Sequence, residues 1–198
     1  MAESHRHFLP AAGADWLLPF YDPFTRLLGA ASALRRLIAQ AELAPGHRVL
    51  DLGCGTGALA LEAKRAQPGC EIVGLDPDVR ALARARAKAG RAGLDIAFEQ
   101  GFGDALPFAD ASFDRVLSSF MFHHLPAAQK PAVLRELRRV LRPGGRLHLL
   151  DFGGASHALT AQMREAGFAR AEPVEQRRLW IASLVYVRAE CPGSASSA

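Results

Sequence analysis

The stretch Val49-Leu50-Asp51-Leu52-Gly53-Cys54-Gly55-Thr56-Gly57 decides the fold of this 198-residue chain. Residues 48–52 are mostly apolar and β-branched at Val49, which is typical of a buried strand. Three alternate glycines follow, and they allow a tight turn in which a ligand can approach main-chain N–H groups. Residues 58–63 then have the composition of a helix. The stretch therefore predicts a strand, a ligand-binding loop and a helix in direct succession.

The acidic residue before the loop distinguishes between two kinds of ligand. The spacing Gly53-x-Gly55-x-x-Ala58 fits the dinucleotide fingerprint. Asp51, however, lies at the strand end two residues before the first glycine, where an ionised carboxylate would repel a pyrophosphate. This position favours a ligand with positive charge. S-adenosylmethionine is such a ligand, because it carries a sulfonium, an ammonium and no phosphate.

The pattern of Asp51 with Gly53, Gly55 and Gly57 closely resembles the first motif of the class I S-adenosylmethionine-dependent methyltransferases. The resemblance covers about residues 44–190 and points to the ubiquinone/menaquinone-type group (methyltransferase type 11). It implies an α/β, Rossmann-like seven-stranded methyltransferase fold, with helices on both faces of the central sheet and an antiparallel C-terminal hairpin. It also implies S-adenosyl-L-methionine as the cofactor and a small-molecule methyl acceptor.

Strand and helix patterns alternate along the rest of the chain, as a parallel sheet with covering helices requires. We expect strands at residues 48–52, 70–75, 96–100, 113–120 and 146–152, and helices at residues 58–67, 78–89, 129–141 and 156–165. Residues 142–145, Arg-Pro-Gly-Gly, predict a turn before the fifth strand. Two β-rich segments, at residues 171–179 and 180–188, have no helix between them and therefore predict an antiparallel hairpin.

Three regions are expected along the chain. Residues 1–43 form a helical lead-in, with helices at 15–28 and 30–43, and contain a candidate substrate flap around Tyr21. Residues 44–190 form the methyltransferase domain, and residues 191–198 form a disordered tail of small residues. Many methyltransferases that resemble this chain carry a Tyr-Asp pair at the position of Tyr21, close to the cofactor. A core-packing aromatic explains Tyr21 equally well.

Acidic residues at the expected strand ends are candidates for cofactor binding, because ligands of open α/β sheets lie at the carboxyl ends of strands. Asp76, followed by Pro77, closes the second strand 23 residues after Gly53. This is the distance expected for a carboxylate that accepts from both ribose hydroxyls. By resemblance, Asp104 accepts from the exocyclic amine of adenine and the N–H of Ala105 donates to the ring. An Asx-turn is the alternative role for Asp104.

The end of the fourth strand carries the candidate catalytic residue. In the fold that the resemblance implies, this end faces the transferable methyl group. We place Ser119 with the cofactor-binding residues and His124 as a base that takes a proton from the acceptor. Packing is the alternative for His124 and the favoured role of His123. A metal site formed by His123, His124 and Asp151 is geometrically possible but is not expected, because adjacent histidines on an extended segment point opposite ways.

Charge and composition limit the partners. The net charge of +4 comes with arginine-rich helix faces, but no aromatic residues interleave with them, which favours solvated helix faces over a nucleic-acid footprint. Residues 118–121, Ser-Ser-Phe-Met, lack the Asn/Asp-Pro-Pro-aromatic tetrad that usually accompanies amine methylation in nucleic acid. No apolar run reaches the ~18 residues of a membrane span. Three cysteines without metal-ligand spacing predict a reducing, cytoplasmic compartment, and nothing in the sequence indicates an oligomeric state.

Two other functions stay open. Only Gly153-Gly154-Ala155 connects the fifth strand with the next helix, whereas many relatives have a longer insert that helps cover the substrate. A cofactor-binding module without catalysis is therefore the first alternative. The second is an NAD-dependent oxidoreductase, which Asp51 and the lack of a Tyr-x-x-x-Lys pair disfavour. The sequence favours methyl transfer by in-line displacement, in which the donor is already activated and positioning supplies much of the catalysis.

Overall fold

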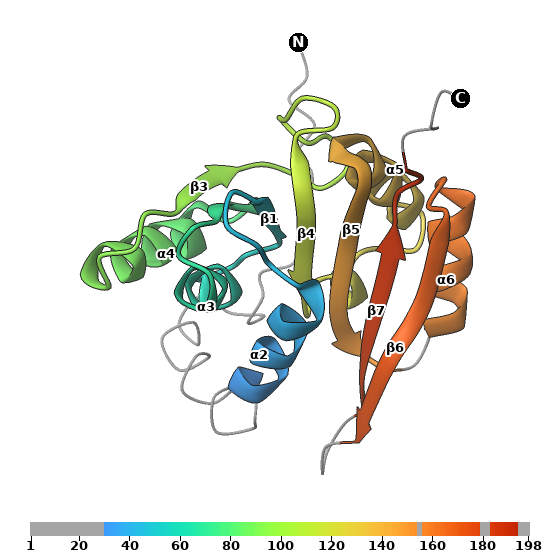
Figure 1. Ribbon diagram of the computed structural model, residues 1–198, viewed down its shortest axis with the longest axis horizontal. Coiled ribbons are helices and arrows are strands. Elements are labelled where there is room, and N and C mark those ends of the chain that lie inside the picture. Colours follow the sequence, from blue (N-terminus) through green and yellow to red (C-terminus); the bar gives the residue numbers. More distant parts are fainter. Residues whose placement is uncertain (1–29, 154–155, 179–182, 194–198) are drawn as a thin grey trace.

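The computed structural model describes residues 30–153, 156–178 and 183–193 (Figure 1). Within these ranges seven strands form one sheet in the order β3-β2-β1-β4-β5-β7-β6. The strands are β1 (Arg48–Leu52), β2 (Glu71–Asp76), β3 (Ala97–Gln100), β4 (Phe113–Ser119), β5 (Leu141–Phe152), β6 (Arg170–Arg178) and β7 (Ser183–Glu190). The helices are α2 (Ala30–Ala41), α3 (Ala58–Ala66), α4 (Val79–Arg91), α5 (Lys130–Val140) and α6 (Ser156–Glu165), with the short 3-10 helix η2 (Phe122–His124).

The pairing of the strands confirms the expected α/β architecture. Strands β1 to β5 pair in parallel, and β7 is antiparallel to both β5 and β6. The sheet grows from β1 in both directions, to β2 and β3 on one side and to β4 and β5 on the other. In such sheets a ligand binds at the carboxyl ends of the strands, where the strand order reverses. The topology therefore directs the search for a site to the ends of β1 and β4.

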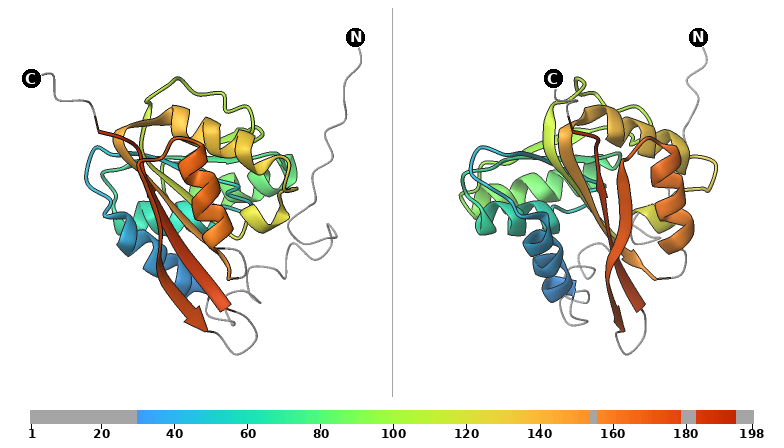
Figure 2. Two further views of the ribbon diagram at one scale, coloured as in Figure 1. Left: turned by 90° about the vertical axis from the view of Figure 1, so that its right-hand side faces the viewer. Right: turned by 45° about the vertical axis from the view of Figure 1, so that its right-hand side comes forward.

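Helices cover both faces of the sheet, as the right-hand view of Figure 2 shows. Helices α2, α3 and α4 share one apolar cluster with the sheet, and α5 and α6 share the other. Val49 belongs to the first cluster and Leu50 to the second, and both are fully buried. Neighbouring strand residues point to opposite faces, so a central strand covered on both faces must be apolar at almost every position. Asp51 is the exception among the four buried residues of β1.

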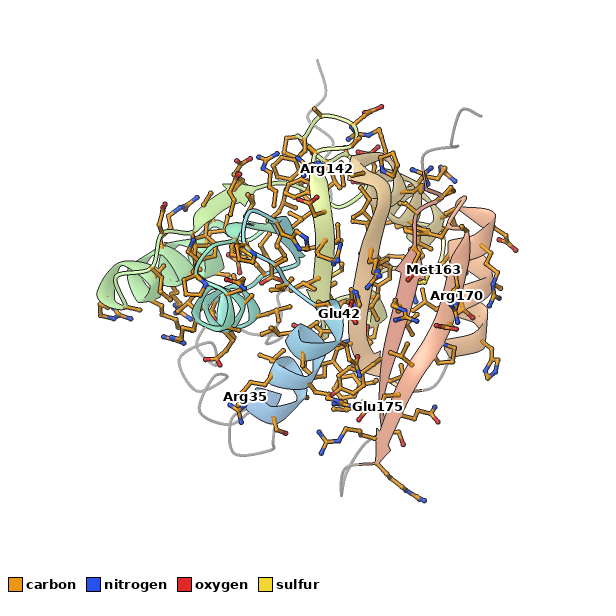
Figure 3. All side chains as sticks on the ribbon, in the orientation of Figure 1. Arg35, Glu42, Arg142, Met163, Arg170 and Glu175 are labelled. Atoms are coloured by element: carbon orange, nitrogen blue, oxygen red, sulfur yellow. The ribbon has the colours of Figure 1, made fainter. Side chains whose placement is uncertain are left out.

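Helix α2 is bound to the C-terminal half of the sheet. Glu175 of β6 accepts hydrogen bonds from Arg36 Nε at 2.7 Å and Gln40 Nε2 at 2.8 Å. Glu42, which directly follows the C-terminal end of α2, pairs with Arg146 of β5 at 2.7 Å. Figure 3 labels Glu42 at the end of this helix and Glu175 on the strand beside it. The lead-in helix expected at residues 30–43 is therefore part of the folded domain.

Strand β5 begins five residues earlier than expected. Residues 142–145 do not end the strand but form a bulge, because the pairing with β4 shifts from Phe113–Leu141 to Arg115–Arg146. The N–H of Gly144 donates to Pro192 O, and the N–H of Cys191 donates to Gly145 O. The polar groups of the bulge are thus satisfied by the chain after β7. Proline and glycine at these positions are compatible with a turn and with a bulge, so the sequence alone could not tell the two apart.

The same contacts bring Cys191 into the folded domain. Cys191, which composition assigns to the tail, is only 3% exposed and belongs to the apolar cluster of α5 and α6. The expected disordered tail therefore begins too early, because Cys191 is part of the folded domain. Residues 194–198, the helix expected at 15–28 and the flap around Tyr21 lie outside the described residues. Other element boundaries differ from expectation by at most three residues.

Candidate functional site

A cavity lies at the carboxyl ends of β1, β2 and β4 and beside the loop after β3, where the topology places a ligand site. It is lined by Leu52, Gly53, Gly55, Leu75, Asp76, Pro77, Asp78, Ala81, Gly101, Phe102, Gly103, Asp104, Phe120, Met121, His124, Leu125, Pro126, Gln129 and Val133. Six residues expected at the site are among them, namely Gly53, Gly55, Asp76, Pro77, Asp104 and His124. Asp51, Gly57, Ala105 and Ser119 are not. The fold thus brings together most of the residues that the strand ends predicted.

The N–H groups of the glycine loop are used within the protein. Gly53 and Cys54 donate to Leu75 O at 2.8 and 3.1 Å, and Gly57 donates to Cys54 O at 2.8 Å. Gly55 donates to Asp76 Oδ2 at 2.8 Å. All four N–H groups therefore have acceptors within the protein, and the contact of these residues with a ligand stays a prediction. A loop whose donors are engaged in this way is poorly suited to phosphate, which binds to exposed backbone N–H groups.

Two of the glycines are required for different reasons. Gly53 has a φ of 70°, and a Cβ there would lie 2.4 Å from Met121 Cγ. Only glycine allows the loop to approach the segment after β4 so closely. Gly57, the N-cap of α3, has a φ of 81°, and its Cβ would lie 3.0 Å from side-chain atoms of Ala85 and Leu61. Packing against α4 explains Gly57, and its contact with a cofactor stays a prediction.

Asp51 lies beneath the loop and not in the cavity wall. Its side chain is 1% exposed, and neither carboxylate oxygen has a donor in hydrogen-bonding geometry among the described residues. Burial raises the pKa of Asp51 to about 7; the nearby N–H of Ala60 opposes the rise and the charge of Asp76 adds to it. A positive charge beside such a group favours its ionised form. Asp51 is therefore suited to respond to a cationic ligand.

Asp76 connects the glycine loop with the turn that follows β2. Its Oδ2 accepts from Gly55 and its Oδ1 accepts from the N–H of Asp78 at 2.9 Å. Burial raises the pKa of Asp76, and the two N–H groups oppose this rise. Each oxygen keeps a further lone pair for a ligand hydroxyl. Asp78 has a separate role, because its Oδ1 accepts from Arg80 N at 2.8 Å and Ala81 N at 3.2 Å and so caps α4.

The loop after β3 presents Asp104 to the cavity at the end of a tight turn. The N–H of Ala105 donates to Phe102 O at 3.2 Å. The resemblance assigns this N–H to the adenine ring, but in the structure it closes the turn. Phe102, Gly103 and Asp104 line the cavity. The turn therefore presents one carboxylate, one aromatic ring and one glycine to a ligand.

The two histidines lie side by side. His123 and His124 belong to η2, and their ring centroids are 3.9 Å apart. The expectation that they point opposite ways is wrong, because the chain leaves the extended conformation after β4 and enters a helical turn. Asp151, buried at the end of β5, accepts from the backbone N–H of His123 at 2.9 Å and bonds its ring Nδ1 at 2.6 Å. The sequence placed Asp151 near the histidines only as a disfavoured metal ligand and did not predict this hydrogen bond, whose partners are 28 residues apart.

The electrostatics of the two rings differ. Burial lowers the pKa of His124, the neighbouring His123 lowers it further, and Asp151 partly opposes both effects. His124 lines the cavity, whereas His123 contacts Asp151 and the ring of Phe152, whose centroid is 5.0 Å away. His124 is therefore a neutral imidazole at pH 7 that faces the cavity. His123 is held behind it by a carboxylate.

An aromatic cluster adjoins these histidines. The ring centroids of Phe120 and Phe152 are 5.4 Å apart, and Phe152 is 50% exposed. Phe120 lines the cavity with a φ of 55°, a conformation that costs energy in a residue other than glycine. Such strain is concentrated at functional sites. The aromatic edge of the cavity therefore belongs to the candidate site.

Other expected residues lie elsewhere. Ser119 ends β4, where it pairs with Leu150 of β5, and Tyr21 lies outside the described residues. Two further residues line the cavity from the start of α5 and were not predicted from the sequence, namely Gln129 and Val133. Their spacing of four residues places them on one helix face, a signal that was present in the sequence. Among the described residues, no helix has the length and apolar character needed to cross a membrane.

Comparison with known proteins gives the family. Residues 49–145 match the model of a methyltransferase domain. This part of the chain is a methyltransferase domain. Demethylmenaquinone methyltransferase of Thermus thermophilus is 45% identical over 140 residues, which cover 69% of this chain and 62% of the relative. The enzyme of the same name from Deinococcus radiodurans is 45% identical over 139 residues, which cover 69% of this chain and 57% of the relative.

The methyltransferase domain also has solved structural neighbours. A SAM-dependent methyltransferase from Methanosarcina mazei superposes with a TM-score of 0.65 at 22% identity, over 78% of this chain and 97% of the other. This likeness shows the fold. The chain spans about 60% of the length of the curated relatives named above.

The cofactor of this methyltransferase class is S-adenosylmethionine, and the described cavity fits it. The cavity wall contains three aspartates and, among the described residues, neither lysine nor arginine. The buried carboxyl of Asp51 lies beneath the same wall without a hydrogen-bond donor. A phosphate-bearing dinucleotide would meet negative charge and engaged N–H groups here. A cofactor with sulfonium and ammonium groups meets complementary charge.

Proposed function

We propose that the domain transfers the sulfonium methyl group of S-adenosylmethionine to a small-molecule acceptor by in-line displacement. The observation that supports this most is the charge of the cavity wall, which carries three carboxylates at or beyond the ends of β2 and β3 and no lysine or arginine among the described residues. In this proposal Asp76 binds the ribose hydroxyls and Asp104 binds the adenine amine. Asp51 provides negative charge beneath the methionine part. Tyr21 is proposed to cover the acceptor from the lead-in.

His124 is proposed as the base. The cofactor supplies an activated methyl group, so the protein has to orient the acceptor and accept its proton. His124 faces the cavity with its pKa lowered by burial, and is therefore unprotonated at pH 7. The bond between Asp151 and His123, together with the 3.9 Å ring contact, holds His124 in one orientation. Because Asp151 already bonds the ring Nδ1 of His123, we assign that ring a supporting role and propose His124 as the acceptor of the new proton.

The aromatic edge suggests which acceptor to test first. Phe120 and the half-exposed Phe152 offer ring faces beside the histidines, which suits a planar aromatic acceptor with an ionisable hydroxyl. Two curated relatives carry the name demethylmenaquinone methyltransferase. A short-chain demethylmenaquinol is therefore the first compound of an acceptor panel, followed by other phenols.

The test measures transfer of a labelled methyl group from S-adenosylmethionine to this panel, together with calorimetric binding of S-adenosylhomocysteine and NAD. Binding of S-adenosylhomocysteine and a labelled product are expected. Tight binding of S-adenosylhomocysteine with no product from any acceptor would favour the non-catalytic module. Tighter binding of NAD than of S-adenosylhomocysteine would overturn the proposal.

His124→Ala tests the base. Turnover should rise with pH through the pKa of His124, which lies below the ordinary ~6.5, because only the unprotonated ring accepts a proton. The variant should lose about tenfold or more in turnover and lose this limb of the pH profile. Its affinity for S-adenosylhomocysteine should stay within about twofold, since no cofactor contact is removed. Full turnover in the variant would reduce His124 to a packing residue.

A further inference from the structure

The side chain of Arg139, near the end of α5, joins this helix to the loop that follows β3. Its Nη1 donates to the carbonyl oxygen of Phe108 and to Asp110 Oδ1, both at 2.7 Å. Its Nη2 donates to the carbonyl oxygen of Leu106 at 3.0 Å. Its own carbonyl oxygen accepts from the N–H of Ala111 at 2.9 Å. One residue of α5 therefore bonds to four residues of the loop.

Glu136, one helical turn earlier, fixes the guanidinium group. Glu136 Oε1 accepts from Arg139 Nε and Oε2 accepts from Arg139 Nη2, both at 2.8 Å. Two parallel bonds of this kind hold the planar guanidinium in a single orientation. Oε2 also accepts from the backbone N–H of Leu106 at 2.8 Å. Both polar backbone groups of Leu106 are thus bonded to the pair that we name the Arg139 clamp, Arg139 with Glu136.

The Arg139 clamp acts next to the cofactor site. Leu106 directly follows the turn from Phe102 to Ala105 that presents Asp104 to the cavity. On the other side of this turn, Val133 of α5 lines the cavity and lies 3.3 Å from the position that a Cβ of Gly103 would take. Helix α5 therefore supplies both the wall against which the turn lies and the bonds that hold its far end.

The energetics favour a geometric role for these bonds. Asp110 is 78% exposed at its side chain, and exposed ion pairs contribute only about 0–1 kcal/mol to stability. Arg139 nevertheless bonds every second residue of the loop, namely Leu106, Phe108 and Asp110. These charged hydrogen bonds restrict the path of the loop, which follows the last residue of β3, Gln100. A site that binds a ring by hydrogen bonds needs its acceptor held to within about 0.5 Å.

We propose that the Arg139 clamp is a positioning device for the cofactor site, which sets the distance between Asp104 and the adenine ring. This rests on the proposed role of Asp104 in holding adenine. Arg139 touches no cofactor atom and acts through the loop. Removing the guanidinium releases Leu106, Phe108 and Asp110 together, so the turn that carries Asp104 loses its fixed position.

Calorimetric titration with S-adenosylhomocysteine tests the proposal. Arg139→Gln and Glu136→Gln should each weaken binding by about tenfold, the effect of one misplaced charged hydrogen bond. The number of binding sites should stay at one per chain, because partial unfolding lowers the stoichiometry whereas misplacement lowers the affinity. The affinity for methylthioadenosine, which lacks the amino acid part, should fall by the same factor in both variants. The matched control is Arg135→Gln, which removes the same charge from an exposed position of α5 and should leave both affinities unchanged.

A double-mutant cycle separates positioning from a general structural effect. If Arg139 acts through Asp104, adding Arg139→Gln to Asp104→Asn should cost no further affinity. Additive losses, or an unchanged affinity in Arg139→Gln, would overturn the proposal. If Arg139→Gln does not fold, Glu136→Gln and Arg139→Lys take its place in the cycle. A wild-type chain that does not bind S-adenosylhomocysteine would overturn the proposed function as well, whereas binding by wild type and Arg139→Gln alike overturns only the clamp.

Discussion

At the scale of single residues, the buried carboxyl of Asp51 lowers the stability of the fold and is suited to interact with a cationic ligand. A buried carboxylate without hydrogen-bond donors destabilises a fold, because ionisation requires it to lose its hydration. The pKa of about 7 means that the folded chain holds a proton on Asp51 that the unfolded chain, with a pKa of ~3.9, has released. The contribution of Asp51 to stability is therefore most favourable in acid and is lost as the pH rises toward 7. A cation of the cofactor can compensate the ionised form.

Asp51→Asn should separate these two effects. Relative to wild type, the free energy of unfolding of the variant should improve by about 4 kcal/mol between pH 4 and pH 8, because it has no proton to release. Chemical denaturation at the two pH values measures this. The affinity of the variant for S-adenosylmethionine should fall, since the negative charge beneath the loop is gone. A pH-independent stability difference would mean that Asp51 is not protonated in the folded chain.

At the scale of elements, the turn between β2 and α4 contains two aspartates with different structural roles. Asp76 holds the glycine loop through Gly55 and is available to the ribose, whereas Asp78 caps α4. Because Asp78 also lines the cavity, its replacement by alanine would change a helix end next to the ligand. A variant that keeps a capping oxygen is therefore the proper control for a ribose contact.

Asp76→Ala should weaken binding of S-adenosylhomocysteine by about tenfold to a hundredfold, from the loss of two hydroxyl bonds to a carboxylate. It should also lower the melting temperature, because the N–H of Gly55 loses its acceptor. Asp78→Ser keeps the cap and should leave the affinity within about threefold. Calorimetry and thermal denaturation of both variants measure these outcomes. Equal losses of affinity would show that the ribose does not bind at the end of β2.

At the scale of the whole molecule, the sheet buries a histidine among cations from three strands. His148 of β5 is 1% exposed, and neither ring nitrogen has a hydrogen-bond partner among the described residues. Burial, together with the charges of Arg115 of β4, Arg146 of β5 and Arg188 of β7, lowers its pKa to about 3. The unfolded chain binds a proton at ~6.5 that the folded chain does not bind. Stability from this group is therefore complete above pH 6.5 and is lost as the pH falls toward 3.

His148→Leu should make the chain more resistant to acid. Because the buried ring stays neutral, the free energy of unfolding of wild type should be about 2 kcal/mol lower at pH 5 than at pH 7. The variant should not show this decrease. Between pH 4 and 6.5 Asp51 acts in the opposite direction, so the two contributions offset each other in wild type. The measurement is the free energy of unfolding of both chains at pH 5 and pH 7.5. A parallel pH dependence of the two chains would show that His148 titrates normally in the fold.

Local pattern predicted the elements because each depends on neighbouring residues. The apolar run before Gly53 gives β1, and the Asp78 cap gives the start of α4. The carboxyl ends of parallel strands meet at one edge, so Asp76, Asp104 and His124 could be placed at one site before any coordinates. Where the sequence signal was ambiguous, as for the glycines at 144 and 145, the expected turn became a bulge inside β5.

The sequence by itself determined the order of strands and helices, the glycine loop and the carboxylates that face a cationic cofactor, because these follow from periodicity and from the direction of parallel strands. Only the tertiary structure decided how the polar groups are paired. Gly55 donates to Asp76, His123 bonds Asp151, and the Arg139 clamp holds the Asp104 loop from a helix about 30 residues further on. A hydrogen bond depends on distances of a few tenths of an ångström between distant segments, and these are fixed only when the apolar clusters on both faces of the sheet have packed.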